Sequence, residues 1–516
     1  MKYNRFSRKI TVFHGREVPE TGLIAGYGSI IDALDLPLPL PHTLCLISSK
    51  KRQYEEEGWL VFTPRHQPED NLYKQLIFAI KYEGINLLVL NRLFAKLTKD
   101  EVLDLIRIEP SGQYSRKIWF LYEWLTQDQL DLPNLSAGNY VPLLDDDIQF
   151  TIEGVRSPRH RILNNLPGTR TFCPLIYKSA KLKAMTSSNL SDQKQTYLSS
   201  IHKDVLRRAS AFLLLKDSKA SFAIEGEEPG GARASRWGRA IGQAGLKPLS
   251  KNEILRLQQI IIASDRFMNM GFREQGGFVG EHDRTTGEPI PDHICARWKD
   301  LEKLIDGLME TSKLLEDPGF DAVLAAAVIS FGFVFIHPLE DGNGRLHRYL
   351  IHHVLSKKQL AEQGIIFPVS ASILNHIDDY RQTLESYSEP LLDFIKWTIT
   401  PENNIEVLNE TMDLYSFFDA TRQAEFLYDC VEDTLRNIIP EEVSYLQKYD
   451  EMKSYLDDHF EMPDKNVALL LRFLEQNNGL FSQRTRINEF SQLDDDEVAD
   501  IEKKYKSIFA FIPDAM

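Results

Sequence analysis

The sequence predicts a mainly α-helical protein that begins with a mixed α/β domain and ends with a helical domain. Residues 1–185 mix short apolar runs with proline and glycine, which is typical of alternating strands, turns and helices. Beyond residue 193, apolar side chains recur at intervals of three and four, the spacing of amphipathic helices. After Pro401 the chain remains helical in pattern and becomes acidic.

The composition excludes several classes of protein. The 516 residues include 60 Lys and Arg and 75 Asp and Glu, which gives a formal charge of −15. This acidic balance argues against a protein that mainly binds nucleic-acid backbones, but it leaves room for a basic pocket that holds one nucleotide. The four cysteines lie far apart, at Cys45, Cys173, Cys295 and Cys430, which excludes a disulfide framework and a cysteine-rich zinc module.

Two observations bear on the compartment. The basic N-terminus lacks the apolar core of a signal peptide. The longest apolar run, residues 322–336, has 15 residues, whereas a membrane span needs about 18 or more. We therefore expect a buried helix at this run, a protein without a membrane partner, and a cytoplasmic location.

The first domain, expected at residues 1–185, has no role that the sequence reveals. The tripeptide Gly26-Tyr27-Gly28 lacks the third glycine of a dinucleotide-binding fingerprint, so we interpret it as a turn. Apolar runs and spacing predict strands within residues 36–47 and 58–64 and helices at residues 72–82 and 90–97.

The middle of the chain is predicted to be helical with one interruption. A polar stretch at residues 186–192 is the best candidate for a linker. Residues 205–215 and 254–262 have helical spacing. Residues 277–291 instead predict a strand, a turn and a second extended piece, because glycine and proline bracket short apolar runs there.

The most informative segment directly follows the apolar run and reads IHPLEDGNGRLHR, residues 336–348. The residue before a proline disfavours the helical conformation, so we expect the apolar helix to end near His337. Gly342 and Gly344 let the backbone approach a ligand closely. The next helix is expected to begin near Gly344 or Arg345, and its free N–H groups would form an anion site.

The side chains of this segment are chemically complementary. Arg345 and Arg348 are three residues apart, so both can lie on one helix face and reach the anion site. Asp341 offers a hard oxygen ligand suited to Mg²⁺. His337 is a natural general base. This inventory fits phosphoryl or nucleotidyl transfer, whereas an ordinary turn with a structural histidine would not need it.

The segment resembles the signature of the Fic family, HPFx(D/E)GNGRxxR. It departs from the signature at Leu339, where the family usually has Phe, and an apolar exchange at a packing position changes little. The resemblance covers roughly residues 195 to 400. It implies a Fic-type helical core with a β-hairpin flap, which we place at residues 193–400.

Proteins of this family transfer AMP from ATP to a protein hydroxyl. The resemblance implies that His337 is the base and that Asp341 holds Mg²⁺. It also implies a set of ATP-binding residues, namely Gly342, Asn343, Gly344, Arg345 and Arg348. By a looser correspondence, Asn375 and Tyr380 lie on a helix that closes over the adenine, with core packing as the alternative.

A second stretch, SFAIEG from Ser221 to Gly226, resembles the inhibitory motif of the family, (S/T)xxxE(G/N). It would end an inhibitory helix near residues 210–226. There Glu225 would pair with Arg348 and occupy the place that the γ-phosphate of ATP needs. The alternative is that Glu225 merely ends a helix before a glycine-rich turn.

Three functional hypotheses follow. The first is an auto-inhibited protein adenylyltransferase that uses ATP and Mg²⁺ on a Ser, Thr or Tyr of an unknown protein, itself included, with the flap pairing to the target as an added strand. The second is transfer of another nucleotide or of phosphate, or removal of AMP, by the same fold. The third is an ATP-sensing regulator without catalysis that binds DNA through a helical extension.

This helical extension is expected at residues 401–516, with an end that resembles a winged helix. Its acidic character argues against nucleic acid as a partner. A cap on the catalytic core and a homodimer surface both remain open for it. His347, His352 and His353 lack zinc spacing, so we assign none of them to a metal and expect an exposed or packing role for His347.

Overall fold

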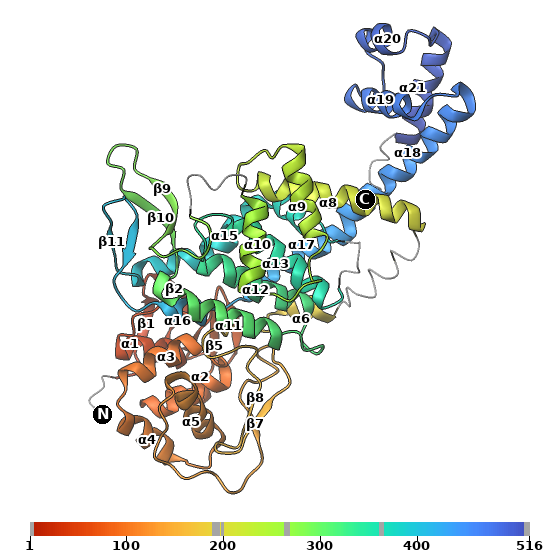
Figure 1. Cartoon of the computed structure of the whole chain (residues 1–516). Helices are drawn as coiled ribbons and strands as arrows, with labels where there is room; N and C mark the ends of the chain where they lie inside the picture. The colour runs from red at the N-terminus through yellow and green to blue at the C-terminus, as the bar shows by residue number, and fades with distance from the viewer. Residues whose placement is uncertain (1–4, 188–196, 198–200, 263–268, 361–365, 510–516) are drawn as a thin grey trace.

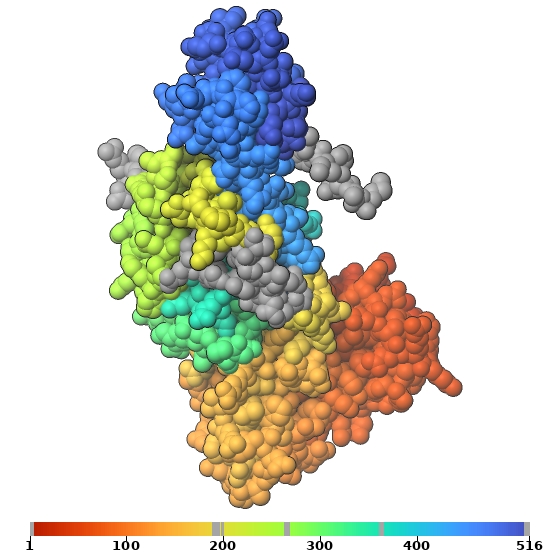
Figure 2. All heavy atoms as spheres, turned by 90° about the vertical axis from the view of Figure 1, so that its right-hand side faces the viewer, coloured from red at the N-terminus to blue at the C-terminus, as the bar shows by residue number. Residues whose placement is uncertain are grey.

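The structure confirms a mainly helical protein with small sheets in its N-terminal region. The computed structural model describes residues 5–187, 197, 201–262, 269–360 and 366–509. Figure 1 shows an N-terminal region in red and orange, a helical core in yellow, green and cyan, and a blue C-terminal projection. The space-filling view in Figure 2 shows the same order along the length of the molecule.

The N-terminal region contains two sheets and several helices. Its strands are β1 (Lys9–Phe13), β2 (Arg16–Ala25), β3 (Leu44–Ile47), β4 (Tyr54–Glu56), β5 (Trp59–Phe62), β6 (Val141–Pro142), β7 (Val155–Ser157) and β8 (Ile162–Asn164). Its helices are α1 (Gly26–Leu34), α2 (Leu72–Tyr82), α3 (Leu87–Lys96), α4 (Lys99–Ile108), α5 (Gln113–Thr126) and α6 (Ala180–Ser187). The larger sheet has the order β1-β2-β3-β5-β4, with β3 and β5 parallel and the other neighbours antiparallel.

One local prediction in this region is wrong. The tripeptide that begins at Gly26 is the first turn of α1 rather than an isolated turn. The amide of Gly26 donates to the side chain of Gln75 at 2.8 Å, and the amide of Tyr27 donates to Glu83 at 2.8 Å. These acceptors come from α2 and the residue after it, so distant side chains satisfy the free amides of the helix start. The sequence around Gly26 does not indicate these distant hydrogen-bond acceptors.

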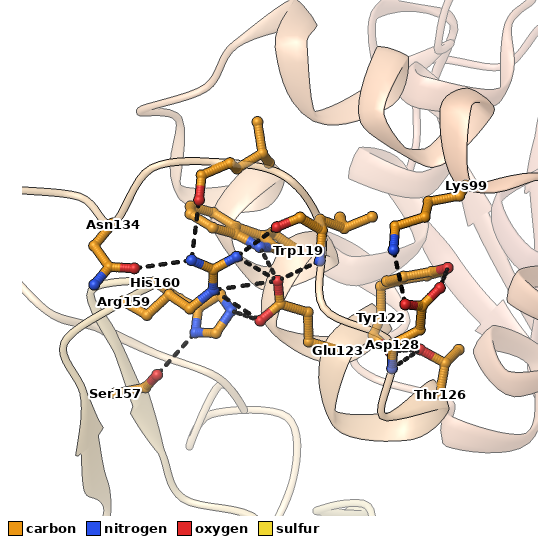
Figure 3. Close-up of polar contacts among 12 residues, drawn as sticks. Lys99, Trp119, Tyr122, Glu123, Thr126, Asp128, Asn134, Ser157, Arg159 and His160 are labelled. Carbon is orange, nitrogen blue, oxygen red and sulfur yellow. Dashed lines mark hydrogen bonds and ion pairs between the residues drawn. The ribbon is translucent and has the colours of Figure 1, made fainter.

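A single carboxylate, that of Glu123 on α5, ties the loops of this region together (Figure 3). It accepts hydrogen bonds from the Trp119 indole at 2.7 Å, the Leu130 amide at 2.9 Å and the Arg159 guanidinium at 2.9 to 3.2 Å. His160 lies 2.9 Å from it. Burial alone would raise the pKa of Glu123, but the bonds from Arg159 and Trp119 lower it to about 2. The network therefore fastens the segment between β7 and β8 to α5.

The helical core surrounds α12 (Ala322–Ile336). Its other helices are α8 (Lys203–Ala223), α9 (Gly231–Ile241), α10 (Lys251–Ile261), α11 (Leu301–Leu314), α13 (Asn343–Lys357), α14 (Val369–Asn375), α15 (Ile377–Ser388), α16 (Met412–Ser416) and α17 (Thr421–Asp433). The helix α12 packs against α13, α17 and α11, and all of its residues after the first are buried. This explains an apolar run without a polar face. Asp321 begins the helix by accepting hydrogen bonds from Val323 and Leu324.

Two hairpins lie side by side at one edge of the core (Figure 1). The strand pair predicted within residues 277–291 is present as β9 (Phe278–His282) and β10 (Pro289–Ile294). A second hairpin, β11 (Trp397–Ile399) with β12 (Ile405–Val407), was not predicted. Asn404 of its turn donates to the carbonyl of Gly276 at 3.0 Å. The domain boundary placed at residue 400 therefore falls inside this hairpin, because Pro401 marks its turn.

The C-terminal projection has its own small core. A π-helical turn (Thr434–Ile438) joins α17 to the long α18 (Ile439–Phe460), which is followed by α19 (Asp464–Gln476), α20 (Gln483–Glu489) and α21 (Asp495–Phe509). The residues up to Leu446 belong to the main core, and a separate cluster begins near Tyr449. The independent unit is thus smaller than the extension predicted for residues 401–516. Its described part is purely helical, so a winged-helix wing is absent from that part.

Two further expectations concern segments around the core. A linker was predicted at residues 186–192. Its first two residues are the last two of α6, and the others lie outside the described residues. Within the described chain, no helix combines the length and the apolar character that crossing a lipid bilayer requires.

We expect the contact between α12 and the N-terminal region to be sensitive to added volume. A Cβ on Gly332 would lie 2.2 Å from the ring of Phe172, which is fully buried. Gly332→Ala should therefore destabilise the protein by about 1–3 kcal/mol, because the ring has no room to move. Thermal unfolding of the purified variant measures this effect.

The matched control is Gly238→Ala in α9, where the added Cβ meets its neighbours at ordinary distances of 3.6 Å or more. This exchange should be neutral or stabilise by up to about 1 kcal/mol through helix propensity. A Gly332→Ala variant as stable as this control would contradict the tight contact with Phe172.

Candidate functional site

The candidate site is built on the turn between α12 and α13. The helix α12 ends at Ile336, and His337 adopts the left-handed conformation with φ 52° and ψ 61°. Gly342, with φ 92°, precedes the first residue of α13. The side chain of Asn343 closes the turn by accepting from the Leu339 amide at 3.0 Å and donating to the Leu339 carbonyl at 2.8 Å. The turn therefore has a fixed shape before any ligand arrives.

His337 is held as a neutral base. Its Nδ1 lies 3.2 Å from the carbonyl of Val334, and because a carbonyl only accepts, the proton of the neutral ring is on Nδ1. The lone pair is then on Nε2. Burial is the main cause that lowers the pKa of His337 to about 3, and His293 and Arg273 add to it. The imidazole is thus in its neutral form at neutral pH, with Nε2 unprotonated.

Asp341 projects a partly exposed carboxylate from the same turn. Its side chain is 41% exposed, and its Oδ1 accepts from the amide of Gly342 and from Arg345 at 3.1 Å. The described residues contain no cluster of three or more His, Cys, Asp or Glu that could hold a metal ion. A cation at Asp341 would therefore take most of its ligands from a substrate and from water.

Two buried arginines of α13 converge on one carboxylate. The side chains of Arg345 and Arg348 are only 1% and 2% exposed. One oxygen of Glu225 lies 2.7 Å from Nε of Arg345, and the other lies 2.7 Å from Nη2 of Arg348. Arg348 also donates to the hydroxyl of Ser221 at 3.0 Å and to its carbonyl at 2.6 Å. The end of α8 is thereby fastened to the first turns of α13.

The carboxylate of Glu225 occupies the N-terminal end of α13. A Cβ on Gly344 would lie 2.4 Å from Oε1 of Glu225, so only a glycine lets the carboxylate come this close. Anions are stabilised at this end of a helix by its free amides and its dipole. Gly226, with φ 73°, turns the chain away directly after Glu225. An internal carboxylate thus sits where the sequence predicted an external anion.

Sequence reasoning missed a second carboxylate. Glu227 lies 3.0 Å from Nη1 of Arg345 and also pairs with Arg233 at 2.5 Å. The guanidinium carbons of Arg233 and Arg345 lie 4.6 and 5.3 Å from the ring centre of Phe222, distances typical of cation–π contacts. Glu227 follows Glu225 by two positions, but nothing in the local pattern separates it from its exposed neighbour Glu228.

Three of the predicted ATP-binding residues have surroundings that the sequence did not predict. The side-chain amide of Asn343 is engaged by Leu339, so its observed contribution is to hold the turn. Asn375 and Tyr380 lie on two helices, α14 and α15, rather than on one. Tyr380 is buried and stacks on His347 at 6.0 Å, whereas Asn375 is exposed at the end of α14. Tyr380 is thus packed in the core and also lies beside Arg348, and its role over the adenine stays a prediction.

The histidines of α13 are packed inside the core. His347 is fully buried, with its ring centre 4.7 Å from that of Phe331, in agreement with a packing role. His352 lies 2.9 Å from the buried carboxylate of Asp217. The same carboxylate accepts from the amide of Ser370 at 2.6 Å, so it ties α8 to both α13 and α14.

Comparisons with known proteins find one family domain in the chain. Residues 248–355 match the model of the Fic/DOC family, which includes the whole turn but ends before α14. No curated protein matches the chain.

Solved structures of two Fic proteins resemble parts of the chain. One is a Fic domain containing signaling protein from Bacteroides thetaiotaomicron, with 20% identity over 51% of this chain and 97% of that one and a TM-score of 0.34. The other is a Fic family protein from Desulfovibrio desulfuricans, with 18% identity over 62% and 90% and a TM-score of 0.37.

The geometry predicts that removing one side chain uncovers an anion site. Glu225→Gly should allow inorganic tripolyphosphate to bind at Arg345 and Arg348, because both cations then lack a shared counter-ion. Wild-type protein should bind it at least about tenfold more weakly, since displacing the carboxylate costs about 1.4 kcal/mol or more. Isothermal titration calorimetry measures both affinities.

Glu228→Gly is the matched control, because it introduces the same residue into the same loop without touching either arginine. It should bind tripolyphosphate like the wild type. Equal affinity of the Glu225→Gly variant and this control would show that the carboxylate does not compete for the anion site.

Proposed function

From the Fic/DOC family domain that residues 248–355 form, we propose that the chain is an auto-inhibited protein adenylyltransferase. It transfers AMP from ATP to a Ser, Thr or Tyr hydroxyl of a protein, itself included. The observation that carries this proposal is the placement of a neutral imidazole, His337, on a fixed turn that ends at two buried arginines. A base beside a triphosphate site is what nucleotidyl transfer needs.

The reaction follows from the atoms at the turn. Nε2 of His337 takes the proton of the target hydroxyl while its oxygen attacks the α-phosphorus of ATP. A bond forms between that oxygen and the α-phosphorus, and the bond from this phosphorus to the oxygen that bridges to the β-phosphate breaks. Pyrophosphate leaves with the electron pair. Arg345, Arg348 and the free amides at the start of α13 stabilise the negative charge of the phosphates.

Asp341 is the residue that would hold Mg²⁺. Its carboxylate is partly exposed and is the hard oxygen ligand of the turn, and Mg²⁺ typically uses one or two carboxylates together with phosphate oxygens and water. When bound, the ion neutralises charge that develops on the departing pyrophosphate. Arg345 lies 3.1 Å from Asp341 and pairs with this carboxylate.

Auto-inhibition rests on the contact between Glu225 and Arg348. The carboxylate is paired with Arg348, the cation that would bind the terminal phosphate of ATP. ATP would therefore bind without reaching the geometry for attack. Removal of AMP by hydrolysis is the second candidate reaction, because Glu225 remains partly exposed at the start of α13, directly after the turn that carries His337. A carboxylate at that place could orient a water molecule toward a modified target.

The proposal predicts the behaviour of two variants with ATP labelled in the α-phosphate. Glu225→Gly should incorporate AMP into itself in the presence of Mg²⁺ at a rate at least about tenfold above wild type, the change that 1.4 kcal/mol produces. His337→Ala in the same background should abolish incorporation, since no base remains. Autoradiography and mass spectrometry of the protein measure the result.

Label from the γ-phosphate instead of the α-phosphate would show phosphate transfer, and preferential use of UTP would show a different nucleotide. Equal rates of wild type and Glu225→Gly would remove the inhibitory role of Glu225. Incorporation that survives His337→Ala would remove its role as the base.

The second carboxylate predicts an additional effect. Glu227→Gln in the Glu225→Gly background should raise AMP incorporation by a further three- to tenfold, as expected from about 0.7–1.4 kcal/mol for a partly exposed charged contact. Arg345 is then free of one more competing anion. Glu228→Gln, which changes an exposed neighbour, serves as the control for lost charge. A rate unchanged by Glu227→Gln would show that Glu227 is only a structural contact.

A further inference from the structure

We infer that Arg273 is a positioning residue for the base: it locks His337 in place and connects it to both ends of the β9–β10 hairpin. This inference rests on the proposed function. Arg273 lies between α10 and β9, outside the signature segment, and its side chain donates to the carbonyl of His337, whereas that of Arg345 pairs with Glu225.

The end of α12 has an unusual set of hydrogen-bond partners. The last carbonyls of a helix have no partner within the helix. Here Val334 accepts from the ring of His337, and Phe335 accepts from Nε2 of His293 at 2.8 Å. Ile336 accepts from the amide of Ala296 at 3.3 Å. The partners therefore come from His337 itself and from the strand β10 with the residues that follow it.

Arg273 donates hydrogen bonds to the carbonyls at the corner of the turn. Its Nε donates to the carbonyl of His337 at 2.7 Å, and its Nη2 donates to that of Ile336 at 3.3 Å. Its backbone amide donates to the carbonyl of Pro338 at 3.0 Å. Three consecutive carbonyls around the base thus accept hydrogen bonds from one residue, and that of Ile336 accepts from Ala296 as well. The left-handed conformation of His337, which costs about 1–2 kcal/mol in an L-residue, is stable because these bonds hold it.

The same guanidinium also holds the hairpin. Its Nη1 donates to the carbonyl of Gln275 at 2.9 Å, and its Nη2 donates to that of Ala296. Gln275 precedes β9 and Ala296 follows β10, so the two contacts bracket the hairpin. A displacement of the hairpin, which is expected from the sequence to pair with the target protein as an added strand, would therefore reach the carbonyl of His337 through one buried side chain.

The electrostatic setting supports a dedicated role. Arg273 is only 5% exposed, and within the described parts of the chain it forms no ion pair with a carboxylate. Burial without a counter-ion is costly, and the partial negative charge at the end of α12 compensates only part of it. Lysine would replace this residue only in part: it keeps the positive charge, but an ammonium group lacks the planar fork that reaches carbonyls on both sides.

The experiment uses Arg273→Met and Arg273→Lys in the full-length Glu225→Gly protein. Both variants should bind ATP·Mg²⁺ within threefold of the parent, because Arg273 does not face Arg345 or Arg348. The rate of AMP incorporation should fall at least about thirtyfold in Arg273→Met and less in Arg273→Lys. Arg297→Met is the matched control, because Arg297 follows the hairpin but pairs with Asp300 and Glu410 instead of the turn.

Nitrogen NMR of the histidine rings gives a readout that does not need activity. The signal of His337 is assigned by its loss in His337→Ala. The parent should show the tautomer with the proton on Nδ1, and Arg273→Met should show a mixture of tautomers. The midpoint of the acid titration should rise in Arg273→Met, since a nearby cation that disfavours protonation is gone, and should stay in place in Arg273→Lys.

An unchanged tautomer, titration and rate in both folded variants would overturn the inference. If Arg273→Met unfolds, as thermal unfolding would show, the result with Arg273→Lys decides: an unchanged rate and tautomer contradict the inference. If the parent protein does not transfer AMP, the proposed function fails, and the NMR comparison alone then tests the positioning of His337.

Discussion

The end of α12 is the physical constraint on which the rest of the site depends. A helix that is buried on all sides must stop within the core, and its last carbonyls must find partners there. The ring of His337, His293 and Arg273 supply them. The imidazole therefore has two tasks: it ends the helix through Nδ1, and this bond leaves Nε2 free as a base. The position of the imidazole is therefore set by the hydrogen bond that the end of α12 requires.

The second constraint is the burial of two cations on α13. Arg345 and Arg348 cannot stay inside the protein without anions. In the resting chain Glu225 supplies that charge to both arginines, and Glu227 and Asp341 supply more to Arg345. The proposed inhibitory contact of Glu225 is therefore also a stabilising contact, and a triphosphate could replace it with little loss of stability. The helix α8, which ends two residues before Glu225, is fastened independently by Asp217 to α13 and α14, and by Arg208 to Asp450 of α18.

Local patterns predicted the elements that depend on local physics. The buried helix predicted at residues 322–336 has the same bounds as α12, because every residue of this helix after the first is buried and needs an apolar or small side chain. The glycine and proline signals located the turn and the first hairpin. The sequence could not reveal contacts between distant segments, such as those of Arg273, the pairing of Glu227 with Arg233, or the side chains that start α1 at Gly26. The hairpin of β11 and β12 was missed because each strand has only three residues, and its turn residue Asn404 binds the carbonyl of Gly276, which lies far away in the chain.

The most direct test of the account is a crystal structure of the Glu225→Gly variant with a non-hydrolysable ATP analogue and Mg²⁺. The account predicts the terminal phosphate on Arg348, in the place that the carboxylate of Glu225 holds in the resting chain. It also predicts an unobstructed path from Nε2 of His337 to the α-phosphorus. A triphosphate bound away from the start of α13, or an imidazole whose Nε2 faces away from it, would contradict the account.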